Sequence, residues 1–266
     1  MGALGVSESR PVAVVTGASS GIGAEFARQL AARGHDLLIV ARRADRLAAL
    51  ADDVARADGA RVEPLVADLA VAAGVDAVAA RLTDPERPVD LLVNNAGVGS
   101  EGRFWELPVD REAAEVALNV VALHRLTHAA LGPMVARGAG GVINVSSLAG
   151  YQPLPMHATY GATKAFVSSF SNALHEELVG TGVRMMVLAP GFTRTEFQAE
   201  SFDPGRIPGV AWQDADAVVV TALRDYERGR AVCISGTVNV AAAVASSVLP
   251  AGVTRRVVGA VTRRMS

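Results

Sequence analysis

Residues 12–23 (Val-Ala-Val-Val-Thr-Gly-Ala-Ser-Ser-Gly-Ile-Gly) decide the fold of this chain. The apolar run Val12–Thr16 is typical of a buried strand, and the glycine-rich turn that follows it opens a helical segment. Glycine permits a tight turn and a close approach of the backbone, while the start of a helix offers free N–H groups and a positive dipole end. The stretch therefore predicts a strand, a turn that binds a pyrophosphate, and a helix; the alternative is a purely structural turn. The residues expected at the pyrophosphate are Gly17, Ser19, Ser20, Gly21, Ile22 and Gly23.

Short apolar runs alternate with helical patterns along the rest of the chain. Continuous apolar runs suit parallel strands that are covered on both faces, and their alternation with helices implies right-handed βαβ units. The pattern predicts an α/β fold, a Rossmann-type doubly wound parallel sheet of about seven strands with helices on both faces. A helix is expected over residues 44–57. The predicted strands are Val12–Thr16, Leu37–Ala41, Arg61–Val66, Leu91–Asn94, Gly141–Val145, Arg184–Ala189 and Ala231–Ile234.

The 266 residues fit a single domain, because half of them are apolar and no repeat or linker marks a second one. Residues 1–10 are interpreted as a flexible leader, without the basic and then apolar pattern of a signal peptide. The irregular segment 191–212 is rich in proline and glycine, and a loop of this length is commonly a lid over a substrate site. Residues 237–266 are expected to form a helical extension. Its apolar part, Val238–Leu249, is too short to span a bilayer and is interpreted as a buried helix.

Composition excludes several classes of function. The formal net charge of −2 provides no field that would favour a nucleic acid. Cys233 is the only cysteine, which excludes an internal disulfide and indicates a reducing, cytoplasmic compartment. We expect no metal site. Lys164 is the only lysine beside 24 arginines, which indicates that a guanidinium would not serve at that position.

The end of the second predicted strand distinguishes NADP from NAD. Folds that bind NAD place an acidic residue there, about 20 residues past the glycines, to accept a hydrogen bond from the ribose. Here Arg42 and Arg43 follow the strand. Two guanidinium groups can form charge-assisted hydrogen bonds with a 2′-phosphate; the alternative is a solvated, basic start of the next helix. The sequence therefore predicts NADP as cofactor, with NADPH favoured over NADH.

Tyr160 and Lys164 are four residues apart in a helical stretch, so that both project from one face. A free tyrosine ionises near pH 10, and a nearby ammonium group lowers its pKa towards a value useful for proton transfer. A pair at this spacing is also common on ordinary helix surfaces. Upstream, Ser146 and Ser147 follow the fifth predicted strand, where a hydroxyl could donate to a carbonyl oxygen as negative charge develops on it. Serines at such a place also form turns.

Taken in order, these motifs resemble those of the short-chain dehydrogenase/reductase family, in its compact branch without a separate substrate domain. The resemblance runs from Val12 to about Ile234. The motifs that carry it are Thr16–Gly23, Asn94-Asn95-Ala96-Gly97, Asn119, Ser147, the pair Tyr160 and Lys164, and Pro190-Gly191.

The resemblance implies a role for each catalytic residue. Tyr160 would transfer the proton, and Lys164 would lower the pKa of Tyr160 and hold the nicotinamide ribose. Ser147, thirteen residues before the tyrosine as in the family, would polarise the carbonyl and is preferred to Ser146. Asn119 would anchor a water in the proton relay. The further cofactor contacts implied by the family are Asp68, Leu69, Asn94, Ala96, Gly97, Pro190, Gly191, Thr193 and Thr195.

The chain departs from the family's acyl-carrier-protein reductases, which usually end in a glycine-rich Asp-Gly-Gly segment after the last strand. This chain has two more helical stretches instead, so it looks nearer the ketoacyl and steroid-type reductases. We expect an apolar ketone or aldehyde as substrate, and this small molecule is the expected binding partner. The residues expected around the substrate are Tyr151, Leu154, Met156 and Phe192.

Several alternatives stay open at the level of sequence. A cofactor-sensing regulator would bind NADP without turnover, although it would not need the catalytic set. An epimerase or dehydratase would usually carry a larger substrate domain. From Val253 onwards, Arg256 and Arg263 share one helical face opposite Val258, Val261 and Met265, which indicates either a terminal helix packed on its domain or weak peripheral contact with an anionic membrane. Family resemblance implies a homodimer or homotetramer.

Overall fold

The computed structural model describes residues 10–197, 209, 212–248, 252, 256 and 259. The remaining residues include most of the predicted lid 191–212 and most of the tail after residue 248. Of the five side chains named for the proposed basic helix, Arg256 is described and exposed; Val258, Val261, Arg263 and Met265 lie outside the described residues.

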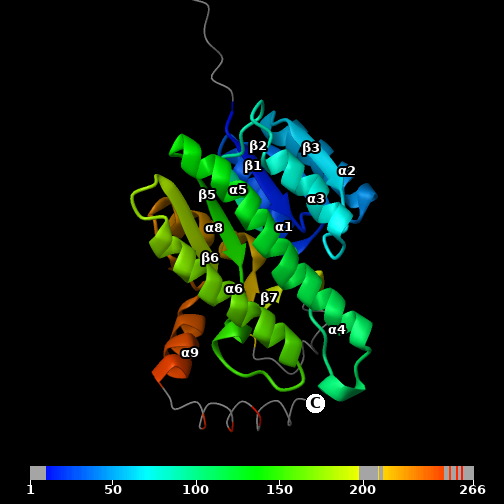
Figure 1. Cartoon of the computed structure of the whole chain (residues 1–266), viewed down its shortest axis with the longest axis vertical. Helices are drawn as coiled ribbons and strands as arrows, with labels where there is room; N and C mark the ends of the chain where they lie inside the picture. Colours follow the sequence, from blue (N-terminus) through cyan, green and yellow to red (C-terminus); the bar gives the residue numbers. More distant parts are fainter. Residues whose placement is uncertain are drawn as a thin grey trace, which may run out of the picture.

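Seven parallel strands form the predicted sheet (Figure 1). Their order across the sheet is β3-β2-β1-β4-β5-β6-β9. Strands β2 and β3 are added on one side of β1 and the later strands on the other, so the strand order reverses between β1 and β4. Each predicted strand is confirmed, with ends that differ by at most one residue. The strands are β1 (Val12–Thr16), β2 (Asp36–Ala41), β3 (Val62–Val66), β4 (Leu91–Asn94), β5 (Gly140–Val145), β6 (Val183–Leu188) and β9 (Val232–Cys233).

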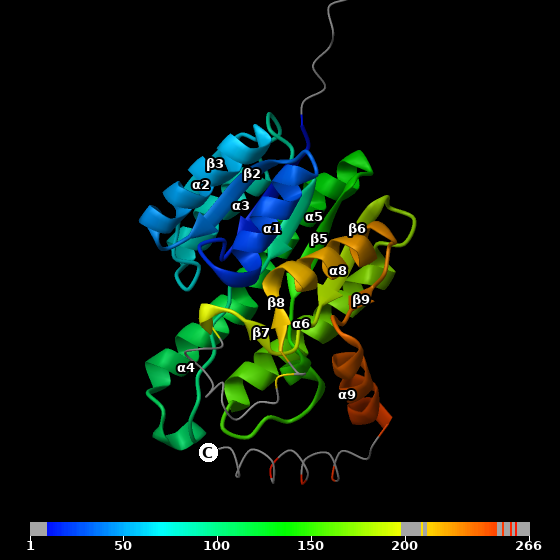
Figure 2. The same cartoon turned by 180° about the vertical axis from the view of Figure 1, so that it is seen from behind.

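Helices cover both faces of the sheet (Figures 1 and 2). Neighbouring side chains along one strand point to opposite faces: Val15 packs in the core with Phe26, while Val14 packs in the other core with Leu126. The continuous apolar runs of the sequence are explained by these two cores. One face carries α1 (Gly21–Ala32), α2 (Ala44–Asp58) and α8 (Ala215–Glu227); the other carries α3 (Ala72–Leu82), α5 (Leu123–Arg137) and α6 (Ala158–Glu177).

Shorter elements lie at the lower end of the molecule in Figure 1, beyond the carboxyl ends of the strands. Helix α4 (Val109–Val116) continues through the π-helical segment η2 (Ala117–Ala122) into α5. The 3₁₀ turns are η1 (Phe104–Glu106) and η3 (Leu148–Tyr151). Two short strands, β7 (Thr193–Arg194) and β8 (Gln213–Asp214), pair with each other and hold the two ends of the predicted lid side by side. The sequence did not predict these strands.

The structure corrects two predictions about the ends of the chain. Arg10 does not belong to a flexible leader, because its guanidinium donates hydrogen bonds to the carbonyl oxygens of Ala31, Gly34 and Asp58. Helix α9 (Thr237–Val248) forms as predicted but is buried on one side only. Its Val238, Val240 and Val244 are 49%, 42% and 56% exposed, because only the face that carries Asn239 and Ala243 packs against the domain. Within the described residues we find no helix with the length and apolar character needed to cross a membrane.

Candidate active site

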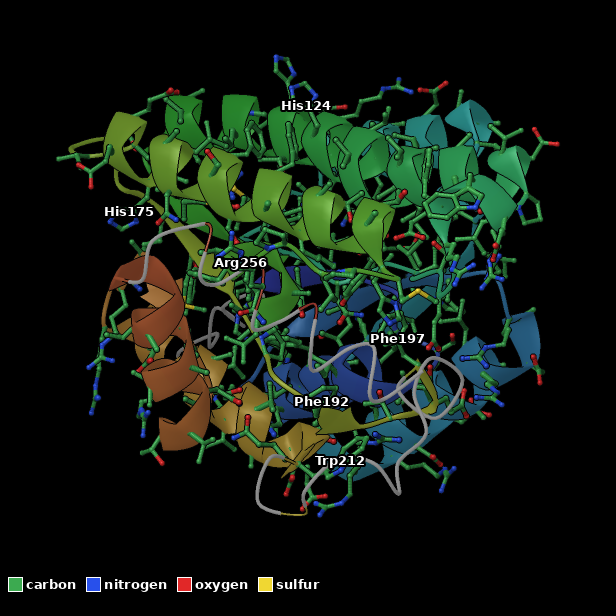
Figure 3. All side chains as sticks on the ribbon, turned by 90° about the horizontal axis from the view of Figure 1, so that it is seen from below. His124, His175, Phe192, Phe197, Trp212 and Arg256 are labelled. Carbon is green, nitrogen blue, oxygen red and sulfur yellow. The ribbon has the colours of Figure 1, made fainter. Side chains whose placement is uncertain are left out.

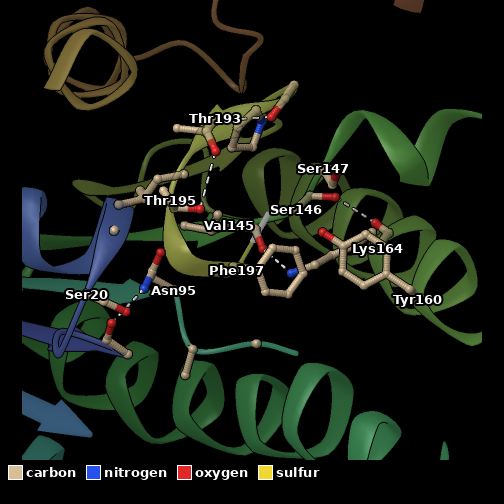
Figure 4. A pocket seen from close by; sticks show the side chains of 17 residues that line it. Ser20, Asn95, Val145, Ser146, Ser147, Tyr160, Lys164, Thr193, Thr195 and Phe197 are labelled. Atoms are coloured by element: carbon tan, nitrogen blue, oxygen red, sulfur yellow. Dashed lines mark hydrogen bonds between the residues drawn. The ribbon is translucent and has the colours of Figure 1, made fainter. Parts of the chain in front are cut away.

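A cavity lies at the carboxyl ends of the central strands, beside the point where the strand order reverses (Figure 4). Ligands bind at this place in doubly wound sheets. The cavity brings together segments that are far apart in sequence, from the glycine turn to α6 and the loop after β6. The predicted residues that line it are Gly17, Ser20, Gly21, Ile22, Ala96, Gly97, Ser147, Tyr160, Lys164, Pro190, Gly191, Thr193 and Thr195.

Tyr160 and Lys164 lie on one face of α6 and are almost fully buried, with 8% and 5% of their surfaces exposed. The Lys164 ammonium lies 5.7 Å from the centre of the Tyr160 ring. Its Nζ donates a hydrogen bond of 2.9 Å to the carbonyl oxygen of Val145, the last residue of β5. Strand β5 and helix α6 therefore hold the amine beside the phenol.

The structure separates the two candidate serines. The Ser146 hydroxyl donates to the carbonyl oxygen of Lys164 at 2.7 Å and lies 2.8 Å from Ser168 Oγ, so it ties β5 to α6. Ser147 caps η3 and forms a hydrogen bond with the Tyr160 side chain. Both serines line the cavity, but the Ser146 hydroxyl is engaged by Lys164 O and Ser168, so the geometry supports the choice of Ser147.

Asn119 lies behind the cavity wall, in the π-helical segment η2. Its amide accepts a hydrogen bond from Val98 N and donates to Val98 O and Thr163 Oγ1, so its side chain clamps the loop after β4. A Cβ at Gly97 would lie 3.1 Å from Asn119 Oδ1 and 3.3 Å from Lys164 Nζ. Gly97 is therefore the spacer that lets the loop pass between these two groups.

The predicted lowering of the Tyr160 pKa is not found in the structure. Burial raises the pKa of Tyr160 to about 12, and the hydrogen bond from Ser147 opposes the rise only in part. Burial also lowers the pKa of Lys164 to about 8. The physical reason is desolvation: a site that excludes water penalises the charged form of each group.

The glycine turn fits a bound pyrophosphate. Helix α1 begins at Gly21 with no acidic residue in its first turn, and the Ser20 side chain does not cap it. The first N–H groups of the helix therefore remain available for an anion. A Cβ at Gly17 would lie 2.8 Å from Asn95 Nδ2, and one at Gly23 only 2.3 Å from the Gly17 carbonyl oxygen. Gly23 thus allows the turn to pack closely on α1 and does not line the cavity itself.

A second cavity adjoins the first and shares Gly17, Ser20, Ala96, Gly97 and Phe197 with it. It contains the remaining predicted cofactor residues except Gly23 and Asn94: Ser19, Arg42, Arg43, Asp68 and Leu69. The Arg43 guanidinium donates to Ser19 Oγ at 3.0 Å and to Ser20 Oγ at 2.9 Å. The first cavity therefore joins the glycine turn to Tyr160 and Lys164, and the second joins the glycine turn to the arginines. Two adjoining cavities lined in this way fit the two halves of a dinucleotide.

The side chain of Asn94, which was predicted as a cofactor contact, lies away from both cavities. Its side chain is buried and donates hydrogen bonds to Thr127 Oγ1 at 3.0 Å and Asn144 Oδ1 at 2.9 Å, on the α5 side of the sheet. The next residue, Asn95, lines the cavity and donates to the carbonyl oxygen of Thr16. The alternation of side chains along a strand was the signal that could have separated the two asparagines.

The side chains expected around the substrate do not line the cavity beside Tyr160: Tyr151, Leu154, Met156 and Phe192 are absent from its wall. The aromatic neighbour of Tyr160 is Phe197, whose ring centre lies 5.8 Å from that of the tyrosine. No sequence motif marked Phe197. Across the described residues there is also no group of histidine, cysteine and acidic side chains that could hold a metal ion.

Comparison with known proteins identifies the family. A family model described as short chain dehydrogenase matches residues 11–205. An uncharacterized oxidoreductase of Myxococcus xanthus is 42% identical over 195 residues, which cover 72% of this chain and 76% of that protein. The chain therefore belongs to the short-chain dehydrogenase family.

Solved structures agree with this assignment. A short-chain dehydrogenase from Sphingobium yanoikuyae in complex with NADPH has a TM-score of 0.80 and 38% identity, over 84% of this chain and 87% of its own. An alcohol dehydrogenase from Comamonas testosteroni, described as specific for bulky-bulky ketones, has a TM-score of 0.77 and 33% identity, over 84% and 85% of the two chains. The seven-stranded parallel sheet is thus the Rossmann-type fold of this family.

Proposed function

We propose that this chain is an NADP(H)-dependent oxidoreductase that interconverts a carbonyl compound and an alcohol, with Tyr160 as the general acid and base. The observation that carries the proposal is the meeting of Tyr160, Ser147 and Lys164 in one cavity with the glycine turn of α1. The turn supports binding of the dinucleotide, and the hydroxyl groups support catalysis on an oxygen atom. NADP(H), when bound, supplies or accepts the hydride.

Each catalytic side chain has a distinct task in the reductive direction. The Ser147 hydroxyl donates a hydrogen bond to the carbonyl oxygen and stabilises the charge that develops there. Tyr160 gives its proton to the same oxygen. Its raised pKa supports this role, because the phenol is protonated and ready to donate at neutral pH. Lys164, held by Val145, faces the Tyr160 ring and stabilises the phenolate that remains.

The preference for NADP over NAD rests on charge. Arg42 and Arg43 line the second cavity, and no acidic residue stands at the end of β2 to accept a hydrogen bond from an unphosphorylated ribose. The NADPH bound to the Sphingobium relative supports the same choice.

The substrate class rests on the relatives and on the pocket wall. The ketone-specific Comamonas enzyme supports a ketone as substrate. Phe197 beside Tyr160 supports an apolar substituent on that ketone. We place the chain nearer the ketoacyl and steroid-type reductases within the family.

The test is the substitution Tyr160→Phe. Removing the hydroxyl should lower kcat for NADPH-dependent reduction of ketones about 10²- to 10⁴-fold, the usual contribution of a positioned acid, while NADPH binding is retained. Tyr226→Phe is the matched control, since Tyr226 packs against Gly141 at the opposite end of the sheet and should keep full activity. Full activity of Tyr160→Phe would exclude the mechanism. NADPH binding by the wild type without product from any ketone or aldehyde would indicate a sensor instead.

A further inference from the structure

The start of the predicted lid carries an acid that touches the arginines of the second cavity. Glu196 Oε2 lies 3.0 Å from Arg43 Nη1, and Glu196 Oε1 lies 2.5 Å from Arg46 Nη1. The three side chains are between 41% and 47% exposed, so water and a ligand can reach them. Both arginines lower the pKa of Glu196, which keeps the carboxylate charged.

The position of this carboxylate coincides with the expected phosphate site. Glu196 lines the same cavity as Arg42 and Arg43. Arg43 also bonds Ser19 and Ser20 of the glycine turn, so its guanidinium already points into the place where the adenosine ribose is expected. Arg46, in the first turn of α2, adds a cation that the sequence did not single out.

We propose that Glu196 competes with the 2′-phosphate of NADP(H): its carboxylate pairs with Arg43 and Arg46, and these arginines exchange it for the phosphate when the cofactor binds. The proposal rests on the proposed function and deepens it. A phosphate monoester carries a charge of about −1.5 to −2 at pH 7 and three acceptor oxygens, so it is a stronger ligand for two guanidinium groups than one carboxylate. A cofactor without this phosphate leaves the ion pairs of Glu196 in place, so its binding should not depend on Glu196.

Glu196 also connects the phosphate site with the catalytic tyrosine. The next residue, Phe197, lines both cavities, and its ring lies beside Tyr160. Figure 4 shows the Phe197 ring next to Lys164 and Tyr160, and Figure 3 shows it on the same side of the molecule as Phe192 and Trp212. We therefore expect release of Glu196 by the arginines to move Phe197, the aromatic side chain in the wall of the catalytic cavity.

Calorimetry with two cofactor fragments tests the exchange without turnover. The fragments are adenosine 2′,5′-bisphosphate and adenosine 5′-monophosphate, and the proteins are the wild type, Glu196→Gln and Asp214→Asn. Asp214→Asn is the matched control, because it removes one negative charge from another exposed ion pair, that with Arg194. The proposed function requires that the wild type bind the bisphosphate at least tenfold more tightly than the monophosphate.

The inference predicts a selective effect of Glu196→Gln. Removing the competing carboxylate should tighten binding of the bisphosphate about three- to tenfold, the range expected from two half-exposed ion pairs, and change monophosphate binding less than twofold. Asp214→Asn should change neither. Equal changes for both fragments, no change, or weaker monophosphate binding would overturn the role of Glu196 even if the wild type prefers the bisphosphate. Loss of that preference in the wild type would instead contradict the NADP assignment.

The link to the catalytic cavity needs its own measurement. The substitution Phe197→Trp places a fluorescent ring at the junction, in a background where the two native tryptophans, Trp105 and Trp212, are replaced by phenylalanine. Addition of the bisphosphate should shift the fluorescence emission of the tryptophan introduced at position 197. Addition of the monophosphate to the same degree of saturation should leave that emission unchanged. An emission that stays constant while the bisphosphate binds would contradict the coupling.

Discussion

At the scale of single residues, Lys164 explains why one lysine stands among 24 arginines. Its slender amine reaches Val145 O while it lies over the Tyr160 ring, in a site with almost no exposure. A guanidinium is wider and planar and keeps its charge under all conditions. An ammonium can be desolvated and can change its protonation state, and burial indeed lowers the pKa of Lys164 to about 8.

The lowered pKa predicts how stability depends on pH. Between about pH 8 and 10.5, Lys164 is neutral in the folded protein and still protonated in the unfolded chain, so the unfolded state binds more protons. The contribution of Lys164 to the free energy of unfolding therefore rises with pH across this window. It is least favourable below pH 8, where the charged amine is buried.

Lys164→Met removes this titration and nearly preserves the shape of the side chain. The free energy of unfolding of the wild type minus that of the variant should rise by roughly 3 kcal/mol between pH 8 and 10.5. Urea denaturation at several pH values measures the difference, and Tyr226 and Cys233, which lie outside the cavity that holds Lys164, titrate equally in both proteins. Parallel stability curves would show that Lys164 keeps an ordinary pKa.

At the scale of elements, the glycine turn and α1 depend on a contact that admits no side chain. Gly23 lies inside α1, where a glycine normally costs stability relative to alanine. Here a Cβ would lie 2.3 Å from the Gly17 carbonyl oxygen, so the backbone of the turn would have to move. Gly23 therefore lowers the helix propensity of α1 but allows the glycine turn to pack against the helix.

Gly23→Ala should consequently destabilise the protein by about 2–4 kcal/mol, as expected for overpacking against backbone, and should weaken NADPH binding at least tenfold. Gly132→Ala is the control, because Gly132 lies inside α5 with no atom within 4 Å of an added Cβ. Its effect on the free energy of unfolding should stay below about 1 kcal/mol. Alanine has the higher helix propensity, but Pro133, the next residue, disfavours a helical conformation for a residue with a Cβ before it. Thermal unfolding and calorimetry measure both effects, and similar values for the two variants would refute the packing argument.

At the scale of the whole molecule, α5, α6 and the π-helical segment η2 present apolar side chains outward. Val121 is 49% and Phe166 38% exposed. Phe166 stacks on Phe170 at 5.5 Å, and Phe170 meets His124, which projects from the outer edge of the helices in Figure 3. Because exposed apolar clusters of this kind favour association, this surface supports the homodimer or homotetramer that family resemblance implies.

Light scattering coupled to size exclusion tests that assembly. The wild type should have a mass of two or four times 27.4 kDa, and the double variant Val121→Glu with Phe166→Glu should have the mass of one chain, because charges at a buried interface are costly. Val66→Glu and Val71→Glu replace exposed valines near the ends of β3 and α3 and should not change the mass. A wild type of 27.4 kDa, or a double variant that keeps its mass, would contradict the assignment of this surface.

The sequence alone determined the strands of the sheet, the glycine turn and the pair formed by Tyr160 and Lys164. These features are encoded locally: a strand buried on both faces needs an apolar run, a phosphate-binding turn needs glycine, and two residues four apart share a helix face. Their order along the chain was enough to indicate the family that the comparisons then identified.

Only the tertiary structure decided how distant segments meet. Glu196 lies 150 residues from Arg46, and no local pattern indicates that their side chains touch. The packing of the sheet directed Asn94 towards Asn144 and left Asn95 at the cavity. The raised pKa of Tyr160 likewise depends on burial, which is set by every segment around the site. Contacts and desolvation are properties of the folded chain as a whole, so they could not be derived from spacing along the sequence.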